Sequence, residues 1–128
     1  MHLSALDPST DLEVRLGLEP DPLESGRRVR WMFTVANRGP DLRRITFASA
    51  HRAEVVLRAG DVDRYRWGRD RMFAAVLSVR ELSPGDEWSF SLDDILPVSP
   101  GRYSLRASVT ARPVLPDIRG EVVVSAGR

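Results

Sequence analysis

The two histidines of this chain are the side chains best suited to exchange a proton near neutral pH, as a general base must. His2 lies close to the start of the sequence, and His51 falls in a predicted turn with no partner motif beside it. The sequence contains no Gly-x-Ser-x-Gly, Walker or dinucleotide-binding motif, and it has no cysteine to act as a nucleophile. We therefore expect the protein not to be an enzyme and to need no cofactor.

Acidic residues that stand close together are the other candidates for chemistry. Asp93 and Asp94 are neighbours, and successive side chains of a strand point to opposite faces. We predict that this pair caps a short turn after a strand that ends at Leu92. Asp61 and Asp63 could share one face, but no EF-hand loop or histidine-rich motif accompanies them, so no metal site is expected.

Arginines alternate with aromatic residues at positions 64–71, a pattern found in surfaces that bind single-stranded nucleic acid. In a strand, however, Tyr65 and Trp67 would point to one face and the flanking arginines to the other. We expect the rings to pack inward, with Trp67 and Phe73 as core residues. The net charge of +1 also argues against a nucleic-acid partner. The exposed contacts of this region are then expected at Arg69, Arg71 and Met72.

Apolar residues recur at every second position along most of the chain, the pattern of strands with one buried face. The stretches with this pattern are residues 12–18, 29–35, 45–47, 55–57, 88–92, 103–109 and 118–124. Half-buried strands are typical of antiparallel sheets, and turns rich in glycine, proline and aspartate separate these stretches. We predict an all-β protein, an immunoglobulin-like antiparallel β-sandwich of seven to nine strands, with a small closed barrel as the alternative.

One segment, residues 69–77, fits a short helix, while residues 74–79 fit a strand equally well. The 128 residues have room for one domain, which we place at residues 11–125 behind a disordered tail of residues 1–10. The start of the chain lacks a signal-peptide pattern, and the longest apolar run, residues 72–77, is too short to cross a membrane. Because cysteine is also absent, we expect a cytoplasmic protein that does not contact membranes.

Several short motifs stand in a characteristic order along the chain. They are Asn37-Arg38-Gly39, the strand around Phe47, Arg64-Tyr65-Arg66-Trp67-Gly68, Ser83-Pro84-Gly85-Asp86 and Pro100-Gly101-Arg102-Tyr103. This series resembles the intracellular proteinase inhibitor family of BsuPI type over about residues 11–125, with Tyr65 where members often have Trp and Gly68 in place of the usual Ser. The resemblance implies a cytoplasmic immunoglobulin-like domain that binds, and could inhibit, a subtilisin-like serine protease. The alternative is a non-inhibitory interaction or scaffold module of the same fold.

Residues 112–117 offer a stiff loop that a protease could bind without cutting it, because Pro113 and Pro116 bracket two apolar residues. Subtilisin-like enzymes accept large apolar residues at the cleavage subsite, and a proline directly after Leu115 would obstruct hydrolysis of that bond. We therefore predict that Val114 and Leu115 contact the partner, in addition to the three residues of the region above. The prolines could instead only shape a connection between strands, and a partner strand could instead pair with an exposed sheet edge.

Overall fold

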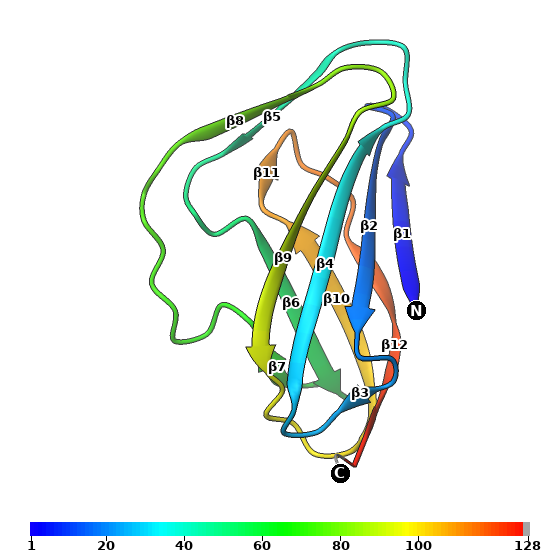
Figure 1. The fold of residues 1–128 in the computed structure, drawn as a ribbon, viewed down its shortest axis with the longest axis vertical. Coiled ribbons are helices and arrows are strands. Elements are labelled where there is room, and N and C mark those ends of the chain that lie inside the picture. Colours follow the sequence, from blue (N-terminus) through cyan, green and yellow to red (C-terminus); the bar gives the residue numbers. More distant parts are fainter. Residues whose placement is uncertain (127–128) are drawn as a thin grey trace.

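The protein is built from two facing layers of strands with the hydrophobic core between them (Figure 1). The computed structural model describes residues 1–126. One layer is a sheet in the order β1-β2-β4-β9, formed by His2–Asp7 (β1), Leu12–Glu19 (β2), Arg28–Asn37 (β4) and Glu87–Ile95 (β9). The other is a sheet in the order β3-β12-β10-β6-β7, formed by Leu23–Glu24 (β3), Ile118–Ser125 (β12), Gly101–Val109 (β10), Ala53–Ala59 (β6) and Val62–Arg66 (β7).

A third, smaller sheet lies at the upper left of Figure 1. Its order is β11-β5-β8, and its strands are Ala111–Arg112 (β11), Arg43–Phe47 (β5) and Ser78–Leu82 (β8). The predicted all-β, immunoglobulin-like sandwich is confirmed. The described residues form twelve strands rather than seven to nine, because short strands such as β3 and β11 add to the predicted ones. Residues 1–126 contain no helix long and apolar enough to span a membrane.

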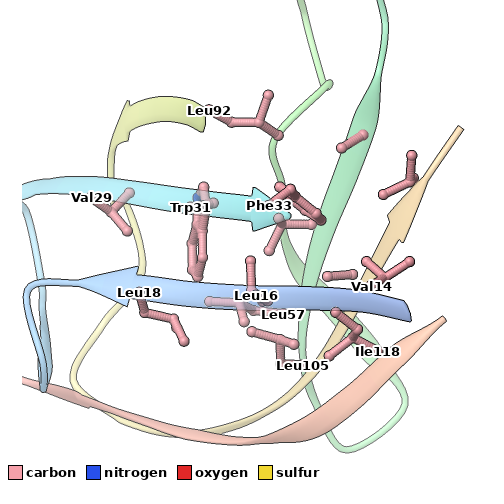
Figure 2. Packing of buried hydrophobic residues seen from close by; sticks show 14 of the residues in the cluster. Val14, Leu16, Leu18, Val29, Trp31, Phe33, Leu57, Leu92, Leu105 and Ile118 are labelled. Carbon is pink, nitrogen blue, oxygen red and sulfur yellow. The ribbon is translucent and has the colours of Figure 1, made fainter. Parts of the chain in front are cut away.

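The apolar residues at alternate positions of the sequence form the core of the sandwich. Leu16 of β2 lies opposite Phe33 of β4 in the strand register, and both side chains are fully buried. Leu57 of β6 and Leu105 of β10 are paired in the same way on the facing layer. Figure 2 shows the labelled side chains of both layers pointing into a shared interior. Full burial of each such side chain stabilises the fold by about 1.5–3 kcal/mol.

The first residues are part of the sandwich, so the expectation of a disordered tail at residues 1–10 is wrong. Strand β1 pairs with β2 in an antiparallel register that places Leu3 opposite Leu16. Leu3 and Ala5 pack against the core, and a Cβ built on Gly120 of β12 would lie 3.0 Å from a methyl group of Leu3. A glycine at that position therefore makes room for the side chain of the first strand.

The prediction that Asp93 and Asp94 cap a turn is wrong, because β9 continues past Leu92 to Ile95. Strand β4 runs beside it for the whole distance, with Arg30 opposite Asp93 in the register. The Arg30 Nε donates a hydrogen bond to Asp93 Oδ1 at 2.9 Å on the outer face. Asp94 turns to the other face and accepts a hydrogen bond from the hydroxyl of Tyr65 at 2.9 Å. The prediction that neighbouring residues point to opposite faces is correct for this pair.

Candidate protein-docking site

The segment between β7 and β8, residues 67–77, presents apolar side chains to solvent, and we call it the 67–77 loop. Figure 1 shows it in green along the left margin of the molecule. Met72 is 99% exposed, Leu77 is 70% exposed and Val76 is 57% exposed. After a turn the loop is neither helix nor strand, and β8 begins only at Ser78. The predicted short helix is therefore absent from this region, and the predicted strand is present only in its last two residues.

The start of the loop is fixed against β6 by a glycine. The Gly68 amide donates a hydrogen bond to Glu54 Oε1 at 2.8 Å, and Glu54 is buried. A Cβ on Gly68 would collide with Glu54 Oε2 and would lie 3.2 Å from His51 Nε2. The sequence departs from the expected Ser at this position because these two side chains occupy the space that a side chain would need.

Three stacked rings hold the middle of the loop against the body of the protein. The rings of His51 and Phe73 lie 4.2 Å apart between centroids at an interplanar angle of 14°. The Trp67 ring lies 5.7 Å from Phe73, and His51 Nε2 lies 3.1 Å from Glu54 Oε2. Stacked rings of this kind stabilise by more than their buried area alone. Trp67 packs against the core as predicted, but Phe73 lies outside it, on His51.

Arg71 connects the turn at the start of the loop to strand β9 of the facing sheet. Its guanidinium lies 4.2 Å from the centroid of the Trp67 ring, and its Nε donates to the Trp67 carbonyl oxygen at 2.8 Å. Its Nη2 also forms an ion pair with Asp94 Oδ1 at 3.4 Å. Cation–π contact and the ion pair act on the same side chain, so Arg71 has a defined position over Trp67.

The three residues of this loop that were predicted to contact a partner differ in whether their side chains are already bound within the protein. Met72 and Arg69 are exposed, as expected for contact residues. Arg71 is exposed as well, but its guanidinium is already bound to Trp67 and Asp94. The sequence did not identify His51, Glu54 and Phe73 as the side chains that hold the loop, since their contacts join segments that are distant in the chain.

The two residues predicted to contact a partner at residues 112–117 differ in their exposure. Val114 is 67% exposed, but Leu115 is 3% exposed and belongs to the core. The segment that contains them leads from β11 in the small sheet to β12 in the large one, and Leu115 fills the interior on the way. Leu115 is therefore not an anchor for a partner, and the prediction that it is one is wrong.

The aromatic residues of 64–71 are not available as a platform for nucleic-acid bases. Tyr65 is 4% exposed, and Trp67 packs against the core. Arg66 forms an ion pair with Asp63 at 3.5 Å. The inward packing of these rings, predicted from the alternation, is confirmed. No three His, Asp or Glu side chains within residues 1–126 are grouped so that they could hold a metal ion.

Solved structures resemble the chain in fold alone. The sporulation control protein Spo0M from Bacillus subtilis matches with a TM-score of 0.53 at 16% identity, over 89% of this chain and 49% of its own. The DNA glycosylase AlkC from Pseudomonas fluorescens has a TM-score of 0.47 at 13% identity, over 87% of this chain and 29% of its own. This chain therefore spans less than half of either protein. No curated protein sequence matches it.

A family model gives the more specific result. The model of BsuPI, the intracellular proteinase inhibitor, matches residues 16–114. The matched stretch begins in β2 and extends past β11, so it includes the 67–77 loop and the side chains that hold it. Since the match covers well over half of the 128 residues, the chain belongs to the intracellular proteinase inhibitor family of BsuPI type.

Proposed function

We propose that this protein binds a subtilisin-like serine protease in the cytoplasm and inhibits it with the 67–77 loop. Met72 is the residue that enters the specificity pocket of the enzyme. The observation that carries the proposal is the full exposure of this methionine, at 99%, on a segment whose neighbouring residues are held in place. A large apolar side chain suits the cleavage subsite of subtilisin-like enzymes, and methionine adapts its shape to such pockets.

The contacts on both sides of Met72 lower the cost of docking. Before it, Arg71 donates to the Trp67 carbonyl at 2.8 Å. After it, Phe73 stacks on His51, and the Ala74 carbonyl accepts a hydrogen bond from the Ala50 amide at 2.9 Å. A segment that is already ordered loses less conformational entropy when it binds, which favours a tight complex.

The apolar surface continues beyond the tip of the loop. Leu77 and Val76 are exposed by 70% and 57%, and Val79 at the start of β8 is exposed by 48%. A stable protein complex buries about 800 Å² on each partner, which one methionine cannot supply. These three side chains extend the contact surface in the direction of the small sheet.

The proposal is tested by titrating the purified protein against a subtilisin-like intracellular protease with a peptide substrate. The wild-type protein should inhibit at micromolar concentration, and Met72→Asp should raise the inhibition constant by at least about tenfold, the cost of losing a central apolar anchor. Leu6→Asp is the matched control, because Leu6 is 53% exposed on β1, away from the loop, and it should leave inhibition unchanged.

Each other outcome assigns the function differently. A loss of inhibition in Val114→Asp but not in Met72→Asp would move the contact to residues 112–117. A protein that binds the protease without slowing it would be the non-inhibitory interaction module. Absence of both binding and inhibition at micromolar concentration would refute the proposed function.

A further inference from the structure

A second cluster lies at the edge of the sandwich where β8 and β9 approach each other, and the proposed inhibition does not use it. Its centre is Trp88 of β9, which is only partly buried. The guanidinium of Arg80 lies 4.7 Å from the centroid of the Trp88 ring, and that of Arg52 lies 5.7 Å from it. The rings of Phe47 and Phe90 contact the same tryptophan, with centroids at 5.5 and 4.8 Å. We call Arg52, Arg80 and Trp88 the arginine–tryptophan cluster.

Two elements bring the arginines to this ring. Arg80 lies opposite Ile45 in the register of β8 and β5, so its side chain shares the inward face with Ile45. Arg52 directly precedes β6, and its backbone carbonyl accepts a hydrogen bond from the Thr110 amide at 2.9 Å. The two positive charges therefore meet at one ring, although one comes from β8 and the other from the residue before β6.

The charges of the cluster have no counter-charge within residues 1–126. None of the ion pairs of this region involves Arg52 or Arg80. The Nε of Arg52 is buried and has no hydrogen-bond partner. A buried donor without a partner destabilises a fold, and the two guanidinium charges at one ring have no acidic side chain among the described residues to offset them. An arrangement of this kind is relieved when an anion binds.

The carboxylates that are nearest in sequence are bound elsewhere. Glu81, next to Arg80, pairs with Arg44 at 3.5 Å. Glu87, next to Trp88, pairs with Arg15 at 2.6 Å. Glu54 accepts hydrogen bonds from the amides of Val55 and Gly68. An anion for the cluster must therefore come from another molecule.

We infer that the arginine–tryptophan cluster binds the carboxylates of an extended acidic peptide. An aromatic ring beneath a guanidinium fixes its plane and leaves its N–H edge free to bind a carboxylate through two hydrogen bonds. Strand β8 is the last strand of the small sheet, so an extended peptide can pair with its open edge beside Arg80. The Trp88 ring already contacts four side chains, which leaves no face for a nucleobase to stack on.

The test is a titration of the ¹⁵N-labelled full chain with tetraglutamate, followed by nuclear magnetic resonance. Tetraglutamate should shift the Nε–H signals of Arg52 and Arg80 and the indole N–H of Trp88 in a saturable way, while tetraglutamine should not. Arg80→Gln and Arg52→Gln should each weaken binding about tenfold or more, the cost of losing hydrogen bonds to a charged group. Arg80→Lys should weaken it as well, because an ammonium cannot form the two-point contact.

Arg106→Gln is the matched control, because Arg106 is an exposed arginine of β10 outside the cluster, and this variant should bind tetraglutamate as the wild type does. Equal binding of tetraglutamine, or equal weakening in the Arg106 variant, would overturn the inference. Inorganic phosphate that binds as tightly as tetraglutamate would overturn the assignment to a peptide carboxylate. Because these readouts contain no protease, they do not depend on the outcome for Met72.

Discussion

Met72 and Leu115 show how far two residues of the same chemical kind can differ in the folded protein. Both are large and apolar and both stand in loops, yet Met72 is 99% exposed and Leu115 is 3% exposed. The sequence predicted the first as a contact residue and also predicted the second, because two prolines flank its loop. The sequence alone could not show that this loop crosses from one sheet to another and that Leu115 packs into the core on the way.

Replacement of Leu115 by Ala should therefore destabilise the fold strongly. We expect it to lower the free energy of unfolding by about 2–5 kcal/mol, the usual result of leaving a cavity in a core. Val114→Ala, in the exposed neighbour, should change it by no more than about 0.5 kcal/mol. Urea denaturation followed by tryptophan fluorescence measures both values, and equal effects of the two variants would contradict the burial of Leu115.

Strands of the two layers are joined by two consecutive hydrogen bonds at Tyr65, one buried and one partly buried. The Trp31 indole of β4 donates to the Tyr65 hydroxyl of β7 at 3.3 Å, and that hydroxyl donates to Asp94 of β9 at 2.9 Å. Burial raises the pKa of Tyr65 well above its usual value of 10.0, and the hydrogen bond to the Asp94 carboxylate acts in the same direction. Tyrosine supplies the hydroxyl that this junction needs, whereas a Trp at this position would bring only an N–H donor.

The raised pKa of Tyr65 predicts a loss of stability in alkaline solution. Above pH 10.0 the unfolded chain loses this proton while the folded chain keeps it, so the free energy of unfolding falls as the pH rises further. Below that pH both states hold the proton and the contribution is fully present. Tyr65→Phe should show a smaller alkaline fall than the wild type in urea denaturation at a series of pH values, and an equal fall in both would contradict the assignment.

Strands with regular alternation could be predicted from the sequence, and strands that bury few side chains could not. The stretches that became β2, β4, β9, β10 and β12 all have apolar residues on one face and a neighbour on which to pack them. Strand β1 contributes only Leu3 and Ala5 to the core, which is too weak a pattern to separate from a frayed end. His51 and Phe73 support the 67–77 loop through a contact between two separate segments of the chain, and no local sequence pattern indicates such a contact.

At the scale of the molecule, arginines on one side form ion pairs, while two arginines on another side have no acidic partner in the described part of the chain. On the outer face of the β1-β2-β4-β9 sheet, Arg15 pairs with Glu87 at 2.6 Å and Arg30 pairs with Asp93 at 2.9 Å. The side with the small sheet carries the exposed Met72, and Arg52 and Arg80 lie there without acidic partners among residues 1–126. Exposed apolar groups beside unpaired arginines are typical of protein-binding surfaces, so both proposed contacts lie on this side.

Hydrogen exchange measured on the protein alone and in complex with a subtilisin-like protease, whose active-site serine has been replaced, tests the account most directly. The backbone amides of residues 69–77 should exchange more slowly in the complex, while those of residues 112–117 and of β1 should exchange at unchanged rates. Unchanged exchange in residues 69–77 together with protection elsewhere in the chain would contradict the account.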